Sequence, residues 1–260
     1  MAKLDLEAAA RTARAAAEAA RTETLPRFRA VDVETKDDGS PVTEADRAAE
    51  RAIRSRLAED FPDFGFLGEE YGEQRSVDGP CWVIDPIDGT IGFSRGIPLF
   101  TTLIALLEDN EPVLGLIDCP SLDECFVGWR DGGCWRNGVP CQVTPESDLR
   151  RAIISHGDPF CFELAGEEAA FARMAREVPL LRGYTDAFGH AQVLSGGVGA
   201  MVDMQLNLWD AAATQVLVPE AGGRCLTLAQ PNQKIGLLFG NPALVEQLQD
   251  FLTSEILETR

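Results

Sequence analysis

The stretch 82–90 constrains the fold more than any other part of the sequence, because an apolar run there ends in two carboxylates and a hydroxyl. Its first residues, Trp-Val-Ile, predict a buried strand, and Pro86 and Gly89 then predict a sharp turn. The turn carries the side chains of Asp85 and Asp88. A strand end followed by a turn is where a rigid scaffold presents polar groups to a ligand. We therefore expect a binding site at the end of this strand.

A second acidic pair, Glu69 and Glu70, lies shortly before this strand. Three or four carboxylates gathered at one point repel one another unless cations lie between them. Hard cations that prefer oxygen ligands, Mg²⁺ above all, fit such a set. The alternative at this point is a solvated acidic turn, since Asp-Gly pairs commonly occupy turns.

The composition limits the classes of protein to consider. With 260 residues, 45% of them hydrophobic, the chain can bury a sizeable core. We expect one domain over residues 1–260, with an α+β half over about 1–145 joined tightly to an α/β half over about 146–260. Apolar runs fall short of the roughly 20 residues that cross a bilayer, so membrane association is not expected.

Charge and cysteine content narrow the partners and the compartment. The formal net charge of −19 argues against nucleic acid as a partner. Seven cysteines without a Cys-x-x-Cys pair indicate free thiols in a reducing, cytoplasmic compartment. With only His156 and His190 present, histidine-rich zinc chemistry is not expected, and structural roles are assigned to both.

The order of elements predicts mixed sheets covered by helices. Helices are expected over about 4–24, from Thr43 onward, near 163–177, from about 209 to 222, and over 242–257. Strands are expected at 65–68, 81–84, 101–107, 112–117, 124–129, 152–155, 198–204, 225–228 and 235–239. A hairpin-length turn separates the strands at 101–107 and 112–117.

Two further carboxylates stand at predicted helix starts. Thr43 is the expected N-cap of one helix, and Asp46 follows three residues later in the capping-box position. Asp210 stands at the expected start of another helix, where either a cap or an anion-and-metal site is reasonable. Taken alone, both residues fit helix capping. Together with the carboxylates named above, Asp210 completes a set adequate for two Mg²⁺ ions.

Three motifs occur in order along the chain. They are Gly68-Glu69-Glu70, Asp85-Pro86-Ile87-Asp88-Gly89-Thr90, and Trp209-Asp210 with Glu220-Ala221-Gly222-Gly223. In these motifs the chain resembles the inositol monophosphatase family, over about residues 36–240. The resemblance implies a layered αβαβα fold, usually dimeric. It also implies Mg²⁺-dependent, lithium-sensitive hydrolysis of small phosphate monoesters.

The resemblance further implies a set of metal ligands. Glu69, Asp85 and the Ile87 carbonyl would hold one ion. Asp85, Asp88 and Asp210 would hold a second. A third, weaker ion would lie near Glu69, so that each site would contain two to three Mg²⁺ ions.

Catalytic and phosphate-binding roles also follow from the resemblance. Asp46 and Thr90 would hydrogen-bond each other and the attacking water, with support from Glu69. Asp88, Gly89 and Thr90 would contact the phosphate. Two residues separate Asp85 from Asp88, so the Asp-x-Asp pattern of phosphatases that use a covalent aspartyl intermediate is absent.

The substrate is narrowed by two stretches, 92–107 and 184–189, which most resemble the histidinol-phosphatase branch of the family. Asp203 falls where inositol enzymes place a substrate-binding Glu, and Asp186 lies in the second stretch. Histidinol carries an ammonium and an imidazole, which two carboxylates would suit. Two alternatives stay open: Asp186 caps the following helix, and Asp203 is a solvated residue at a strand end.

The sequence therefore predicts an enzyme that hydrolyses L-histidinol phosphate, a step of histidine biosynthesis, and acts as a cytoplasmic homodimer on a small phosphorylated metabolite. An inositol-1-monophosphatase or a broad-specificity phosphatase is the first alternative. A catalytically silent metal-binding interaction protein is the alternative of another class. The complete set of site residues argues against that last alternative.

Overall fold

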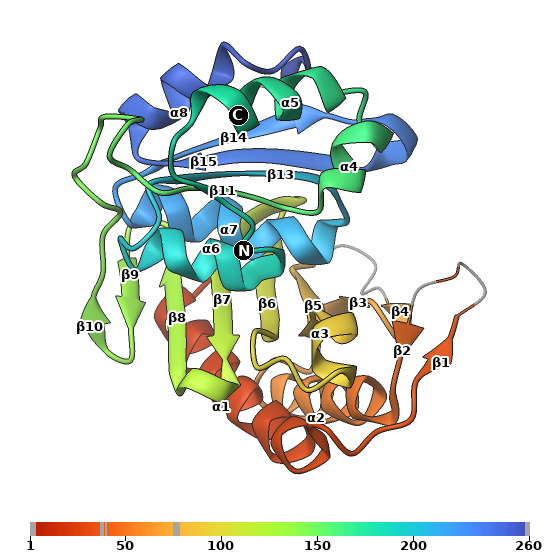
Figure 1. The fold of residues 1–260 in the computed structure, drawn as a ribbon. Helices are drawn as coiled ribbons and strands as arrows, with labels where there is room; N and C mark the ends of the chain where they lie inside the picture. The colour runs from red at the N-terminus through yellow and green to blue at the C-terminus, as the bar shows by residue number, and fades with distance from the viewer. Residues whose placement is uncertain (1–3, 37–38, 40, 75–78, 258–260) are drawn as a thin grey trace.

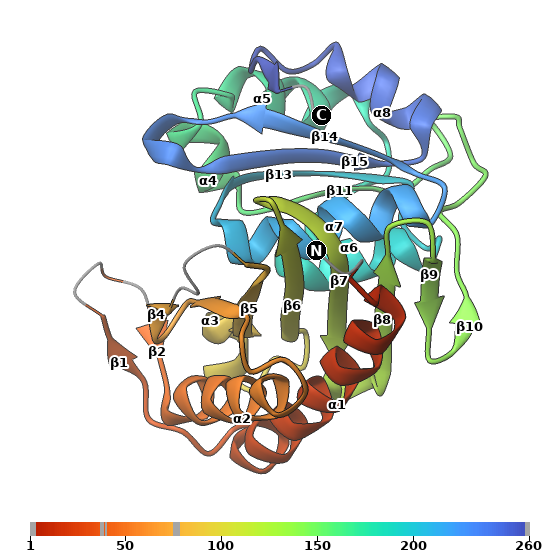
Figure 2. The same cartoon turned by 180° about the vertical axis from the view of Figure 1, so that it is seen from behind.

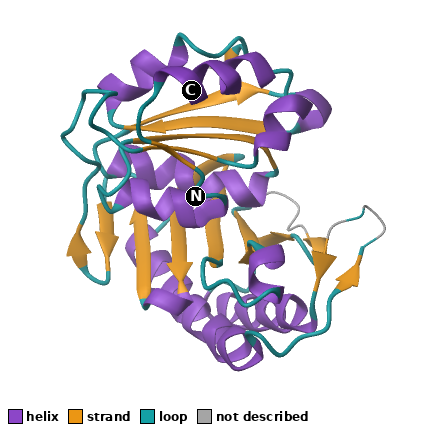
Figure 3. Cartoon of the chain, in the orientation of Figure 1, coloured by secondary structure: helices purple, strands orange, loops and turns teal. Residues whose placement is uncertain are grey.

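Two large β-sheets and three layers of helices alternate through the molecule (Figure 1). The computed structural model describes residues 4–36, 39, 41–74 and 79–257. The same succession of layers is seen from behind (Figure 2), and colouring by secondary structure separates helical from strand layers (Figure 3). The predicted αβαβα layering is confirmed.

The first sheet has the strand order β10-β9-β8-β7-β6-β5-β3-β4. Its strands are β3 (Gly65–Gly68), β4 (Gly72–Gln74), β5 (Cys81–Asp88), β6 (Thr101–Glu108), β7 (Glu111–Cys119), β8 (Glu124–Trp129), β9 (Gly133–Arg136) and β10 (Val139–Pro140). The pair β3 and β5 is parallel, whereas β5 to β8 form an antiparallel meander. Helices α1 (Leu6–Thr24) and α2 (Glu44–Asp60) cover one face, and α6 (Asp186–Leu194) and α7 (Leu208–Glu220) cover the other (Figure 1).

Both faces of this sheet are buried, which explains the nearly continuous apolar sequences of its central strands. Along β5, Val83 packs on the side of α6 and α7, whereas Trp82 and Ile84 pack on the side of α1 and α2. Successive side chains of a strand point to opposite faces, so one short apolar run supplies two cores.

The predicted hairpin between β6 and β7 is confirmed. Asp109 and Asn110 form its turn, with φ of 53° and 65°. Positive φ at both central residues is typical of the type I′ turn, whose twist matches that of the flanking strands.

The second sheet has the strand order β12-β11-β13-β15-β14-β16. Its strands are β11 (Ile154–His156), β12 (Leu181–Arg182), β13 (Ala200–Leu206), β14 (Arg224–Ala229), β15 (Ile235–Gly240) and β16 (Ile256–Leu257). Helices α4 (Pro159–Leu164), α5 (Glu168–Glu177) and α8 (Pro242–Gln249) lie on its outer face (Figure 1). Smaller elements are β1 (Glu34–Thr35), β2 (Pro41–Val42) and α3 (Thr90–Ser94). Within the described ranges, none of the helices combines the length and apolarity that a membrane span requires.

The single helix predicted near 163–177 is wrong, because two helices occupy this region. Asp158 caps α4 by accepting a hydrogen bond from the Phe160 amide at 2.8 Å. Gly166 then adopts φ of 73°, a left-handed conformation that ends a helix. The chain therefore turns between α4 and α5.

The helix predicted over 242–257 is too long, since α8 ends at Gln249. The buried Glu167 carboxylate accepts hydrogen bonds from the amides of Thr253 at 2.8 Å and Ser254 at 2.5 Å. These bonds hold the following segment outside a helix, and its end pairs with β14 as β16.

The contact between β7 and α7 yields a prediction about stability. A Cβ at Gly115 would lie 2.9 Å from Cα of Ala213 and closer still to its carbonyl oxygen. We expect Gly115→Ala to lower the free energy of unfolding by about 1–3 kcal/mol, because backbone must move to accept the methyl group. Urea denaturation measures this. The control is Gly92→Ala, whose Cβ would meet the Ile97 Cβ at 3.7 Å; equal losses in both variants would contradict the prediction.

Candidate active site

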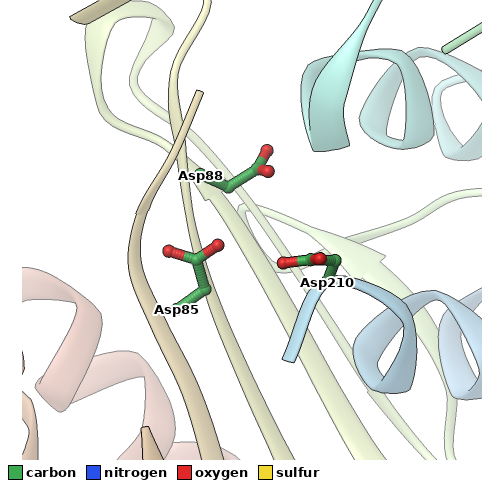
Figure 4. Close-up of side chains that lie close together, drawn as sticks. All are labelled: Asp85, Asp88 and Asp210. Atoms are coloured by element: carbon green, nitrogen blue, oxygen red, sulfur yellow. The ribbon is translucent and has the colours of Figure 1, made fainter. Parts of the chain in front are cut away.

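A bulge at the end of β5 brings its two carboxylates to one side. Asp85 lies opposite Leu103 of β6 and Asp88 lies opposite Thr101. An advance of three residues along β5 therefore pairs with an advance of two residues along β6. In a regular strand, residues three apart point to opposite faces, and one extra residue reverses this. Asp85 and Asp88 therefore face a common space (Figure 4). The sharp turn predicted from Pro86 and Gly89 is confirmed at Gly89, whose φ is 84°, and is wrong at Pro86, because the strand continues through Pro86 to Asp88.

Asp210 reaches the same space from the first turn of α7 (Figure 4). The helix begins at Leu208 with Asn207 as its cap, so Asp210 is its third residue and not the cap. Its Oδ2 accepts a hydrogen bond from the Asn207 amide at 2.7 Å. One oxygen each of Asp85, Asp88 and Asp210 lies within 4.8 Å of the other two. Side chains far apart in sequence thus form one acidic group.

Neighbouring donors fix these carboxylates in place. Oδ2 of Asp88 accepts hydrogen bonds from the Thr101 hydroxyl at 3.0 Å and the Ala187 amide at 2.6 Å. Oδ1 of Asp85 accepts one from the Ile87 amide at 3.1 Å. Such supporting contacts orient ligand oxygens before a cation arrives.

The electrostatics of this group favour a bound cation. Burial, together with the charge of Glu69, raises the pKa of Asp85 well above its usual value. Burial and the charge of Asp186 do the same to the pKa of Asp88. Burial also raises the pKa of Asp210 to about 7. Three carboxylates that resist ionising together are stabilised by a divalent ion, and an all-oxygen anionic donor set fits Mg²⁺.

Asp46 takes part in the capping box of α2 and is also a partner of Thr90. Its Oδ2 accepts hydrogen bonds from the amide and hydroxyl of Thr43, at 2.8 and 2.5 Å, which completes the predicted capping box of α2. Its Oδ1 lies 3.2 Å from the Thr90 hydroxyl, which also lies 2.9 Å from the Ile87 carbonyl oxygen. Burial raises the pKa of Asp46. The capping and catalytic interpretations of Asp46 are therefore compatible.

Glu69 lies at the edge of the acidic group and is paired with a lysine. Lys36 Nζ lies 2.8 Å from Glu69 Oε1 and 2.6 Å from Glu70 Oε1. Burial raises the pKa of Glu70 to about 7 despite this lysine. Among the described residues, the cluster of close carboxylate oxygens consists of Asp85, Asp88 and Asp210, so Glu69 lies outside this close group.

A cavity of about 270 Å³ lies over these residues. Its lining includes all of the predicted site residues except Asp46: Glu69, Asp85, Ile87, Asp88, Gly89, Thr90, Asp186, Asp203 and Asp210. The metal-binding candidates thus lie in the same cavity as the two carboxylates that were assigned to the substrate.

The two substrate candidates differ in exposure. Asp186, at the start of α6, is exposed and accepts a hydrogen bond from the Thr185 hydroxyl at 3.2 Å. The capping alternative for Asp186 is wrong, because Thr185 occupies the cap position of α6. Asp203 is only 5% exposed, so the alternative of a solvated strand end is wrong as well. Both side chains line the cavity.

Comparison with known proteins places this geometry in context. The model of the inositol monophosphatase family matches residues 2–259. The chain belongs to the inositol monophosphatase family. It is 38% identical over 197 residues to a histidinol-phosphatase of Chlorobaculum parvum, covering 76% of each chain. It is 31% identical over 240 residues to an inositol-1-monophosphatase of Rhizobium meliloti, covering 86% of this chain and 87% of the relative.

Solved structures agree on the fold of this inositol monophosphatase family member. The crystal structure of the extragenic suppressor protein suhB from Bartonella henselae matches it with a TM-score of 0.85 and 29% identity, over 94% of this chain and 98% of the other. Family and named relatives together support a phosphatase that acts on phosphoric monoesters.

Sequence reasoning missed four residues at the site of this phosphatase. Lys36 could not be recognised as a site residue, because a single lysine is part of no sequence motif that indicates a site. Asp158 and Cys161 line the cavity, but the helix expected near 163–177 did not include them. His190 was assigned a structural role, yet its Nε2 lies 3.0 Å from Asp203 Oδ2. Its spacing of four residues from Asp186 on one helix was the available signal.

The raised pKa values predict how a cation affects stability. An acid whose pKa is higher in the folded state weakens folding as the pH rises from its ordinary pKa through the raised one, here about 7 for Asp210. A cation that binds the ionised carboxylates removes this penalty. We therefore expect Mg²⁺ to raise the melting temperature more at pH 8 than at pH 6, measured by differential scanning fluorimetry.

Matched variants test whether the effect arises at this site. Asp88→Asn should lose both the Mg²⁺-dependent rise in melting temperature and turnover, because it removes a charge from the acidic group. The exposed Asp63 lies outside the cavity lining, so Asp63→Asn should behave as wild type. The same Mg²⁺ effect in Asp88→Asn and wild type would place the cation elsewhere.

Proposed function

We propose that this protein is a Mg²⁺-dependent phosphatase that hydrolyses L-histidinol phosphate to L-histidinol and phosphate. The observation that carries the proposal is the division of one cavity between two kinds of carboxylate. Asp85, Asp88 and Asp210 form the close acidic group, whereas Asp186 and Asp203 line the same cavity outside it. The first set suits a phosphate held through cations, and the second suits a cationic organic group.

The proposed metal ligands are Glu69, Asp85, Asp88, Asp210 and the Ile87 carbonyl. Two to three Mg²⁺ ions bound there would neutralise phosphate charge, lower the pKa of a water molecule and stabilise the leaving oxygen. The chain itself keeps these ligands oriented through the hydrogen bonds of Thr101, Ala187 and Asn207.

Thr90 and Asp46 are proposed to orient and deprotonate the attacking water. The Thr90 hydroxyl can accept a hydrogen bond from water while donating its own hydrogen to Asp46 Oδ1, 3.2 Å away. Since burial raises the pKa of Asp46, this carboxylate is better able to share the proton. Glu69 supports the water from the cavity side, and the backbone amides at Gly89 and Thr90 can contact phosphate oxygens. The water oxygen forms a bond to phosphorus as the ester P–O bond breaks.

The choice of histidinol phosphate rests on charge and on the relatives. Histidinol has an ammonium group, and carboxylates placed near it provide complementary charge. The histidinol-phosphatase relative is 38% identical, against 31% for the inositol-1-monophosphatase relative. Inositol 1-phosphate, or a broad set of small phosphates, is the alternative substrate. The alternative of another class, a silent metal-binding protein, requires that phosphate release be absent.

We also propose that the enzyme acts as a cytoplasmic homodimer without nucleic-acid or membrane partners. None of the seven cysteines, all of which lie within the described residues, forms a disulfide, which suits a reducing compartment. Sedimentation equilibrium would test the dimer.

A substrate panel tests the proposed function. We expect phosphate release with Mg²⁺ to be fastest for histidinol phosphate when it is compared with inositol 1-phosphate, fructose 1,6-bisphosphate and phosphoadenosine phosphate. The physical reason is the charge match between the ammonium of histidinol and the carboxylates of Asp186 and Asp203, which we call the wall carboxylates of the cavity. Higher kcat/KM for inositol 1-phosphate would replace the proposed substrate, and no release from any ester would favour the silent alternative.

Asp186→Ala tests the wall of the cavity, formed by Asp186 and Asp203, separately from its metal side, formed by the proposed metal ligands. We expect its KM for histidinol phosphate to rise about 10-fold, because one charge-assisted contact is lost. The kinetic constants for inositol 1-phosphate should change by less than about 2-fold. Steady-state kinetics with Asp63→Ala as the control measures both. An equal loss on the two esters would remove Asp186 from the specificity residues.

A further inference from the structure

The carboxylate of Asp203 has one hydrogen-bond contact with a backbone amide and one with a side chain. The pairing of β13 with β15 shifts register between Asp203 and Leu206, and Gln205 has φ of 63°. The regular ladder is thus interrupted directly after Asp203 and resumes at Leu206. Its Oδ1 accepts a hydrogen bond from the Met204 amide at 3.0 Å, and its Oδ2 lies 3.0 Å from His190 Nε2.

The ring of His190 is held from three sides. Nδ1 lies 2.6 Å from the Thr214 hydroxyl of α7, opposite the contact of Nε2 with Asp203. The Phe239 ring packs against it edge-on, with centroids 4.7 Å apart. His190 belongs to the lining of the cavity but is only 1% exposed, and its Nε2 is directed to Asp203. A buried ring held in this way has one orientation and cannot release Asp203 without breaking its other contacts.

Hydrogen-bond chemistry decides which nitrogen carries the hydrogen. A bare lone pair on Nε2 would repel the Asp203 oxygen at 3.0 Å, so Nε2 must donate. Neutral imidazole then accepts from the Thr214 hydroxyl at Nδ1, whereas a protonated ring donates at both nitrogens. The donor to Asp203 is present in both charge states.

His190 also links the wall of the cavity to its metal side. It lies one helical turn after Asp186 and Ala187 on α6, and the Ala187 amide donates to Asp88. Its partner Thr214 lies one turn after Asp210 on α7. The contact between His190 and Thr214 therefore joins the two helices that carry carboxylates to the cavity.

We propose that His190 is a positioning residue for substrate specificity, which holds the Asp203 carboxylate toward the cationic organic part of the substrate through Nε2–H. This inference rests on the proposed function for the identity of the cation. The relation between His190 and Asp203 is independent of which phosphate ester the enzyme prefers.

The test is steady-state kinetics on variants of His190. They distinguish loss of the N–H donor to Asp203 from loss of the imidazole ring itself. We expect His190→Leu to raise KM for histidinol phosphate about 10-fold, since a hydrogen bond to a charged group is lost, with kcat within about 2-fold. His190→Gln keeps an N–H near the position of Nε2 and should return KM to within about 3-fold of wild type. Neither should alter KM for p-nitrophenyl phosphate, which has no cation.

A double-mutant cycle with Asp203→Asn distinguishes positioning from a general structural role. In the Asp203→Asn background, His190→Leu should cause no further rise in KM, because the charged carboxylate that His190 is proposed to position is already absent. Thr214→Val should raise KM in the same direction by a smaller factor. Its matched control is Thr227→Val, which removes the hydroxyl that accepts from Gln215 outside the cavity lining, and should leave KM unchanged.

Three results would overturn the inference. The first is an equal change of KM for histidinol phosphate and p-nitrophenyl phosphate in His190→Leu. The others are full additivity of the KM effects of His190→Leu and Asp203→Asn, and a KM in His190→Gln that stays as high as in His190→Leu. If wild type prefers an ester other than histidinol phosphate, the proposed function fails, and the cycle is measured on the preferred ester. If the KM effects of His190→Leu and Asp203→Asn on that ester are non-additive, the positioning role of His190 is retained. If they are additive, the role is rejected. Melting temperatures identify any variant that unfolds, and Thr214→Val then supplies the milder perturbation of the same contact.

Discussion

The repulsion among Asp85, Asp88 and Asp210 is the constraint on which the rest of this structure depends. Their oxygens lie within 4.8 Å of one another in a setting that raises all three pKa values. Such a group persists only if other parts of the fold hold it. Donors come from β6, from the first turn of α6 and from the cap of α7. The layered packing that brings these elements together is what makes the cluster possible.

The middle helical layer has the decisive position, because both of its helices begin at the cavity. The first turn of α7 carries Asp210, and that of α6 carries Asp186 and the amide that binds Asp88. Both helices are packed between the two sheets, so their starts have little freedom to move. One layer thus sets the geometry of the metal side and of the substrate wall together.

Local patterns in the sequence predicted mixed sheets covered by helices, the central strands and the hairpin at residues 109 and 110, because these follow from apolar periodicity and turn chemistry. The αβαβα layering was implied by the family resemblance. The bulge between Asp85 and Asp88 could not be predicted in this way, since it exists only in the pairing with β6. Likewise, the end of α8 could not be predicted. The segment after it is held by Glu167, more than 80 residues earlier, which accepts hydrogen bonds from the amides of Thr253 and Ser254. The site residues were found by motif resemblance, whereas the contact of His190 with Asp203 required the fold.

Helix capping and site chemistry share the same carboxylates in this protein. Asp46 and Asp210 are each the third residue of a helix, and one oxygen of each accepts a hydrogen bond from the backbone amide of the cap residue. This bond fixes each side chain. In Asp46 it leaves Oδ1 for the Thr90 hydroxyl, and in Asp210 it holds a carboxylate that belongs to the close acidic group. A sequence pattern that indicates a cap therefore does not count against a role in the site. At a helix start that faces a cavity, the cap is the means by which a short carboxylate is held still enough to act there.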